Sequence, residues 1–288
     1  MLFRDEIKAH SLLKKISYYR LKGYWWDVQS DSVLHTFQPD VYFEDIIERY
    51  NFDRQLRIIL FEAVEQIEIA LRTKMIYHLS IAYGGLWYLI PALFYNAVIT
   101  QKGVTGTAHQ FALDELQKEF ERSQEIFIKD QRFRYPGQNA DAWKILEVAS
   151  MGTLSKLYKN LRNQLPEKAI IANEMGLNSI FTFVGWLESV TLMRNMIAHH
   201  ARLWSRPMVK IPSMQLNNPV GAWLTRPLQP KQVNKPFAII SCMTYLCNFL
   251  NQSDEIKQKI IELIKAYPNV PIYKLGFFNR WHTEPLWK

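Results

Sequence analysis

The stretch FDRQLRIILFEAVEQIEIALRTKMIYHLSIA, residues 52–82, decides the fold class of this chain. Its apolar residues recur at spacings of three and four, which places them along one side of a helix. These residues are Leu56, Ile59, Leu60, Ala63, Val64, Ile67, Leu71 and Met75. Asn51 or Asp53 is the candidate N-cap, and the helix is expected to end before Gly84. The stretch therefore predicts one long helix with a buried stripe.

The other face of this stretch carries a row of carboxylates, Glu62, Glu65 and Glu68. Such a row resembles a set of metal ligands. Ion pairing on a helix surface explains the same spacing, and Glu68 lies one turn from Arg72, where the two can pair. We expect the ion pairs and predict no metal and no cofactor.

The same helical periodicity continues through most of the chain. An amphipathic helix is expected at residues 4–20, and a short helix capped by Asp40 at 41–50. Further helices are expected at 109–129, 143–149, 153–161, 167–174, 179–200, 237–251 and 254–266. The segments 86–107 and 203–236 are expected to be irregular, and the aromatic cluster from Tyr18 to Trp26 is expected in the core. Because no alternating strand pattern of any length is present, the predicted class is all-α.

Three segments are expected to organise the 288 residues, which suffice for a sizeable core. Residues 1–50 form an N-terminal helical extension, and residues 51–205 form a helical core with an inserted helical segment. Residues 206–288 form a basic, Pro-rich loop region and C-terminal helices that pack on this core.

The sequence favours a cytoplasmic protein with no membrane association. Charged residues from Arg4 to Lys8 interrupt any signal-peptide core, and the longest apolar run, residues 237–250, is too short to span a bilayer. The two cysteines, Cys242 and Cys247, lie in that run without a zinc-site pattern, so we expect buried free thiols.

Positive charge is concentrated in the last third of the chain. Residues 1–200 carry 23 Lys and Arg against 23 Asp and Glu, whereas residues 201–288 carry 12 against 4. No acidic residue occurs between Glu188 and Asp254, while that interval holds Arg194, Arg202, Arg206, Lys210, Arg226, Lys231 and Lys235. Such a composition suits a polyanion, although a basic surface that only aids solubility explains it equally well.

One motif in this interval can carry chemistry. Arg194-Asn195-Met196-Ile197-Ala198-His199 closes an apolar helix and is followed by His200. Cleavage of RNA by its own 2′-hydroxyl needs a base, an acid and a cation that stabilises the charge on phosphorus. Histidine titrates near neutral pH, and arginine can bind two phosphate oxygens at once. Arg194 and His199 are therefore the candidate catalytic pair, with Asn195 beside them and His200 as the second-ranked histidine.

The spacing of this pair imposes a geometric condition. At about 100° per residue, positions 194 and 199 lie roughly 140° apart around an ideal helix, so the arginine's length or a loosened last turn must bring them together. Asn195 and His199 are four residues apart and face the same way. Because one chain offers a single Arg and His, too few for a separate acid and base, we expect a homodimer.

Structural roles for the same residues remain open. An arginine and a histidine at a helix end can simply satisfy its last carbonyls and its dipole. Trp204, between Arg202 and Arg206, can stack on an unpaired base or pack the helix end. With these reservations, the predicted RNA-binding residues are Arg202, Trp204, Arg206, Lys210, Arg226, Lys231 and Lys235.

The sequence resembles the abortive-infection AbiD/AbiF family of the HEPN superfamily, whose ribonucleases carry an Arg-x4-His signature. The resemblance is carried by ordered blocks along most of the chain. They are ISYYRLKGYW at 16–25, YNFDRQLR at 50–57, IEIALRT at 67–73, GTLSKLY at 152–158, and Trp186-Leu187 ahead of 194–204. The resemblance implies a HEPN-type helical bundle, a role in phage defence or toxin–antitoxin behaviour, and RNA as substrate or bound regulator.

Three functional hypotheses follow from the sequence. The first is a metal-independent endoribonuclease with His199 as general acid and base and Arg194 as phosphate binder, which leaves 2′,3′-cyclic phosphate and 5′-hydroxyl ends. The second is a non-catalytic protein that holds a structured small RNA. The third is a dimeric adaptor acting through protein contacts, which the carboxylate-free interval disfavours.

Overall fold

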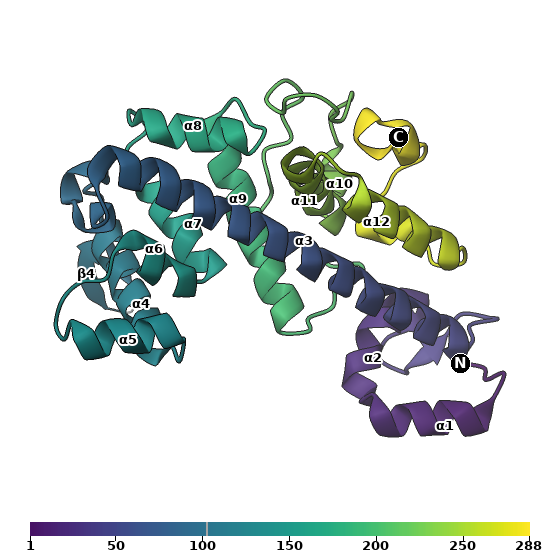
Figure 1. Ribbon diagram of the computed structural model, residues 1–288. Coiled ribbons are helices and arrows are strands. Elements are labelled where there is room, and N and C mark those ends of the chain that lie inside the picture. The colour runs from purple at the N-terminus through teal and green to yellow at the C-terminus, as the bar shows by residue number, and fades with distance from the viewer. Residues whose placement is uncertain (102) are drawn as a thin grey trace.

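One helix, α3 (Phe43–Tyr83), runs through the molecule, and the other elements are arranged around it (Figure 1). The structure is a computed structural model that describes residues 1–101 and 103–288. The buried side of α3 carries the predicted stripe, including Leu56, Leu60, Ile67 and Leu71, each at most 1% exposed. The all-α class is confirmed, since the described strands form only two small two-stranded sheets.

Helix α3 joins the two helices expected at 41–50 and 52–82, so the boundary expected at residue 50 falls inside a continuous helix. Neither Asn51 nor Asp53 is an N-cap. The helix begins after Tyr42, where the acidic Glu44 and Asp45 lie in the first turn and complement the helix dipole. Its end is as predicted, because Gly84 takes the positive φ that stops the helix and its N–H bonds the Ser80 carbonyl.

The N-terminal segment forms a pair of helices, α1 (Glu6–Lys15) and α2 (Tyr18–Trp25), in place of the single helix expected at 4–20. The break occurs because Ile16 is extended and the Ser17 side chain caps α2 by accepting from the Arg20 N–H. A 3-10 turn, Trp26–Val28, and a hairpin of β1 (Gln29–Asp31) and β2 (Thr36–Phe37) follow.

At the opposite end of α3 lie α4 (Ala108–Arg122), α5 (Ile126–Arg134), α6 (Ala142–Ile145), α7 (Met151–Asn160) and α8 (Pro166–Glu174) (Figure 1). Two of these helices replace the one expected at 109–129, because Ser123 is extended and ends α4. The segment 86–107 is not wholly irregular. It contains 3-10 turns at Trp87–Leu89 and Pro91–Leu93 and an antiparallel pair, β3 (Val98–Gln101) and β4 (Val104–Thr107).

Helix α9 (Ile180–Ala198) crosses α3 and also packs on α7, α8 and α11. The C-terminal α11 (Pro236–Asn251) and α12 (Glu255–Ala266) lie along α3, preceded by the short α10 (Pro230–Val233). Short 3-10 turns at Ile272–Leu275, Trp281–Thr283 and Pro285–Trp287 end the chain. Cys242 and Cys247 are buried free thiols, as predicted. Within the described residues, no helix combines the length and apolarity needed to cross a membrane.

Candidate functional site

The motif lies where α9 ends. The Ala201 N–H bonds the Met196 carbonyl at 2.8 Å, and the His200 N–H bonds the Ile197 carbonyl at 2.9 Å. These two bonds form a Schellman motif, which requires the residue after the cap to be left-handed. His200 occupies that position with a φ of 53°, although glycine is the usual residue there. The last turn is therefore loosened at His200 and not at His199, which is the C-cap with a φ of −90°.

A groove of about 1010 Å³ opens beside this helix end. Its walls come from the α1–α2 connection, the middle of α3 and the end of α9. The lining residues are Lys15, Ile16, Ser17, Arg20, Tyr50, Arg54, Arg57, Ile58, Phe61, Arg194, Ile197, Ala198 and His200. Five of these carry a permanent positive charge, of which Arg57 is paired with the buried Asp53, and no lining residue carries a carboxylate. The remaining four cations make the groove suited to an anionic ligand.

Of the four candidate catalytic residues, the groove wall includes Arg194 and His200. His199 and Asn195 are both exposed on the same side of α9, as their four-residue spacing predicts, but neither is a lining residue. The five-residue step from Arg194 to His199 thus keeps the two side chains on different sides of the helix end. The left-handed turn brings His200, the second-ranked histidine, to the groove that Arg194 lines.

Arg194 is half-buried against α3, and the structure describes no carboxylate bonded to it. Its charge nevertheless reaches Glu68. Burial raises the pKa of Glu68, and the positive charges of Arg72 and Arg194 partly offset this rise. Glu68 pairs with Arg72 at 2.9 Å, as predicted, and Glu62 pairs with Lys259 at 2.6 Å. Two of the three carboxylates in the acidic row of α3, Glu62 and Glu68, therefore form ion pairs with their neighbours.

A buried carboxylate, Asp53 of α3, fixes the chain that follows the motif. Asp53 is 0% exposed and accepts from the backbone N–H groups of Leu203 at 3.1 Å and Trp204 at 2.8 Å. It also accepts from the Tyr24 hydroxyl at 2.6 Å and pairs with Arg57 one turn along α3. Burial and the Asp53 charge raise the pKa of Tyr24 well above its usual value. All of these groups are satisfied within the fold, so the network is structural.

A second bond ties the motif to the N-terminal helices. The guanidinium of Arg20, on α2, donates to the His200 carbonyl at 2.8 Å. The backbone of His200 is therefore held by a residue from another helix, and Arg20 links α2 to the end of α9.

Of the predicted RNA-binding residues, Trp204 is part of the core and Arg202 is half-buried. Trp204 is 0% exposed with the Arg49 guanidinium 5.7 Å from its ring centroid, so a role in stacking on a base is wrong. The Arg202 side chain donates to the Trp204 carbonyl and packs on Gly23, where an added Cβ would lie 2.6 Å from its Nε. Burial lowers the pKa of Arg202, and we assign it to holding α2 against the chain after α9.

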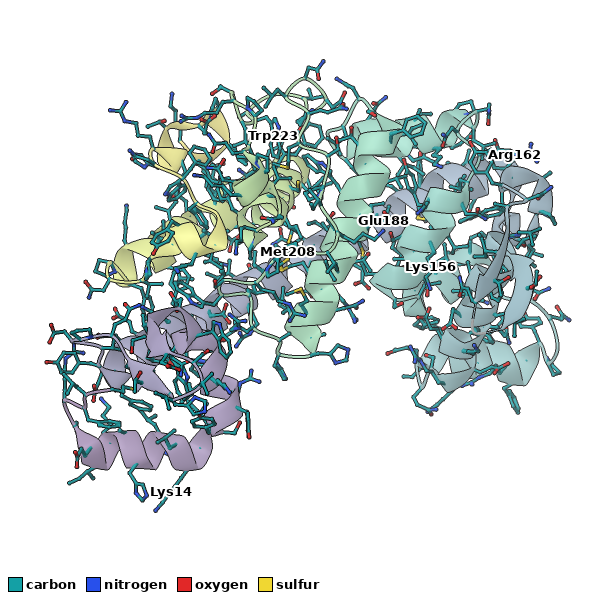
Figure 2. All side chains as sticks on the ribbon, turned by 180° about the vertical axis from the view of Figure 1, so that it is seen from behind. Lys14, Lys156, Arg162, Glu188, Met208 and Trp223 are labelled. Carbon is teal, nitrogen blue, oxygen red and sulfur yellow. The ribbon has the colours of Figure 1, made fainter. Side chains whose placement is uncertain are left out.

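The other basic residues after the motif do not line the groove. Lys210 lies 3.4 Å from Glu188 of α9, a residue labelled in Figure 2, and Arg226 pairs with Glu284 at 2.6 Å. Lys235 donates to the Ser205 carbonyl at 3.4 Å. Arg206 and Lys231 are exposed. The continuous basic path expected along this interval is therefore not formed at the motif, and RNA binding by its exposed residues stays a prediction.

Sequence reasoning missed most of the groove's cations, namely Lys15, Arg20, Arg54 and Arg57. A signal for the first two was present, because residues 7–26 hold no acidic residue. Arg54 and Arg57 lie just after Asp53 on α3, and the sequence favoured surface positions for the charged residues of this helix. They come to lie beside the motif only because α9 crosses α3.

Comparison with known protein families matches residues 11–205 to the family described as Abi-like protein. The match begins inside α1 and spans α2, α3, the helices at its far end, the motif and the segment held by Asp53. No curated protein and no solved structure matches the chain. Because the matched region covers more than half of the 288 residues, the chain belongs to the Abi-like protein family.

Proposed function

We propose that this chain is a HEPN-type endoribonuclease that acts in abortive infection or as a toxin restrained by an antitoxin. The observation that carries the proposal is the groove, in which Arg194 and His200 share a wall with four further cations and no carboxylate. Membership of the Abi-like family supports the setting in phage defence.

The chemistry follows from the side chains that line or border the groove. Arg194 would bind the oxygens of the scissile phosphate and stabilise the negative charge that builds up on them. A histidine at the end of α9 would take the proton of the 2′-hydroxyl or give one to the departing 5′-oxygen. This reaction leaves 2′,3′-cyclic phosphate and 5′-hydroxyl ends and requires no metal ion.

A second copy of the chain would complete the set of acid and base. His199 is exposed at the helix end but outside the groove wall, so a partner's groove can receive it. We therefore propose a homodimer joined near the end of α9. Mixing Arg194→Ala with His199→Ala subunits should then restore part of the activity, and a strictly monomeric active protein in light scattering would contradict the dimer.

The direct test measures cleavage of total cellular RNA by purified protein in the presence of EDTA, with the product ends identified. Arg194→Ala and His199→Ala should each lower the rate by roughly 10²–10⁴-fold without lowering the melting temperature. His282→Ala, at an exposed histidine of the C-terminal segment, is the matched control. Full activity in folded His199→Ala with a dead His200→Ala would move the assignment to His200, and activity in both would refute a histidine mechanism.

One observation favours a second candidate, a protein that binds a structured small RNA without cutting it. The groove of a single chain presents phosphate-binding cations together with His200 but not His199. Copurification of one RNA species that stays intact through long incubation, with Arg194→Ala losing the RNA, would favour this candidate over the nuclease.

A further inference from the structure

The N-terminal helix pair carries an exposed surface of cations and aromatic rings that the motif does not use. Tyr19 is 81% exposed and Trp26 is 59% exposed, although the sequence places both in a cluster expected in the core. Only Tyr24 and Trp25 of that cluster are well buried, against α3. The fold leaves other rings exposed as well, such as Phe181, and what sets Tyr19 and Trp26 apart is the cations around them.

The two exposed rings lie on either side of Lys22 in the sequence. Tyr19 and Lys22 are three residues apart on α2, and Trp26 begins the 3-10 turn that follows this helix. The Lys22 ammonium lies 5.7 Å from the centroid of the Trp26 ring, so a cation stands beside one of the two rings.

After Glu6, the first residue of α1, all charged residues of the helix pair are basic. Between Glu6 and Asp27 there is no acidic residue, whereas Lys8, Lys14, Lys15, Arg20 and Lys22 all occur there. Among the described residues, no carboxylate pairs with any of these four lysines. In the carboxylate-free interval between Glu188 and Asp254, by contrast, Lys210 and Arg226 each pair with a carboxylate. Figure 2 shows Lys14 on the outer side of α1, pointing away from the molecule. The charge of this surface is thus available to an anion.

The surface is continuous with the candidate site. Lys15, Ile16, Ser17 and Arg20, from the connection between α1 and α2, line the groove that also contains Arg194 and His200. A strand with phosphates in the groove can therefore continue onto α2 without leaving positive potential.

From these observations we infer that the α1–α2 pair is a binding surface for single-stranded RNA, which feeds the groove at the end of α9. Lys14, Lys15, Arg20 and Lys22 contact phosphates, and Tyr19 and Trp26 stack on unpaired bases. Exposed rings between cations suit a single strand because every base has a face for stacking, while a duplex keeps its bases inside. The inference rests on the proposed function in taking RNA as the ligand.

The test measures binding separately from cleavage. The probe is a mixed-sequence single-stranded 2′-O-methyl RNA, whose blocked 2′-oxygen prevents cleavage, and fluorescence anisotropy is recorded at several salt concentrations. The double variant Tyr19→Ala/Trp26→Ala should weaken binding by about 5- to 150-fold for each base that loses its stacking partner. Lys14→Gln/Lys22→Gln should flatten the salt dependence by about 0.7 in log–log slope for each lost phosphate contact.

Matched controls carry the same changes on exposed residues elsewhere. Phe181→Ala removes an exposed ring from α9, and Lys129→Gln/Lys156→Gln removes two exposed lysines from α5 and α7. Both should bind the probe like the wild type, and all variants should keep the wild-type melting temperature because the altered side chains are exposed or, for Lys22, only half-buried.

Three outcomes decide the matter. If both variants of the α1–α2 surface bind with wild-type affinity and salt slope, or if the wild type binds no RNA, the inference is wrong. If the wild type instead binds vesicles of phosphatidylserine and phosphatidylcholine through Trp26 and not RNA, the surface faces a membrane and the inference is also wrong. If the variants bind weakly while unmodified RNA is bound but never cut, the inference holds and the proposed nuclease fails.

Discussion

The two histidines at the end of α9 differ in backbone conformation, and the same substitution should therefore affect them in opposite directions. His200 has a φ of 53°, whereas His199 has a φ of −90°. A left-handed conformation costs a non-glycine residue roughly 1–2 kcal/mol, and glycine at a position that does not need it costs about 0.5–1 kcal/mol of chain entropy. His200→Gly should thus stabilise the fold by up to about 1 kcal/mol, and His199→Gly should destabilise it by about 0.5–1 kcal/mol.

Urea denaturation of the two variants beside the wild type measures this difference, since both histidines are exposed and neither side chain has a described hydrogen bond. The Arg20 bond to the His200 carbonyl involves the backbone and survives the change. A cleavage assay on the same samples separates stability from function: a protein that gains stability and loses activity places His200 in the chemistry. A His200→Gly variant less stable than His199→Gly would refute the strain argument.

Three further predictions concern buried charges. Asp53→Ala should lower the free energy of unfolding by about 3–5 kcal/mol in urea, because it leaves Arg57 and two backbone N–H groups without their partner; a loss below about 1 kcal/mol would contradict this role. Burial lowers the pKa of Lys168 to about 8, so the folded chain releases this proton before the unfolded chain does, and the stability of the wild type relative to Lys168→Met should rise between pH 7 and 9.5. A constant difference would show that Lys168 stays charged. Burial acts to raise the pKa of Glu284. Hydrogen bonds from Thr225 and Arg226 outweigh this effect, so the pKa of Glu284 is lowered. Glu284 therefore contributes stability above about pH 4.5 that is lost as the pH falls through the folded pKa, and Glu284→Gln should cost about 1.5–3 kcal/mol at pH 7 but little in acid.

The fold class could be predicted because it depends on local periodicity. The stripe from Leu56 to Met75 is long and regular, and the segments that became α7, α8, α9, α11 and α12 were placed within a few residues of their bounds. Helix breaks were harder to predict. The break after α1 coincides with the Ser17 side chain capping α2. In α3, Asp53 does not cap a new helix and instead accepts from the distant Leu203 and Trp204 N–H groups, a contact that sequence spacing does not reveal.

The candidate site could be predicted only in part, because the motif is local and the groove is not. Arg194 and the two histidines lie within seven residues, and their spacing alone predicts that Arg194 and His199 point to different sides of a regular helix. Which histidine reaches the groove depends on the left-handed turn at His200, which no glycine marks in the sequence. For Trp204 the sequence left base stacking and packing of the helix end both open, and the fold decides for packing by burying the ring.

The buried carboxylate of Asp53 also bears on how the groove and the N-terminal surface work together. Asp53 binds α2 through Tyr24 and the chain after the motif through Leu203 and Trp204, while Arg20 of α2 bonds the His200 carbonyl. Two independent bonds thus connect α2 to the residues around His200. If RNA binds on Tyr19 and Trp26 as proposed, a rotation of α2 would either carry His200 with it or break these bonds. These contacts of α2 therefore hold the backbone of His200 beside the groove that Arg194 lines.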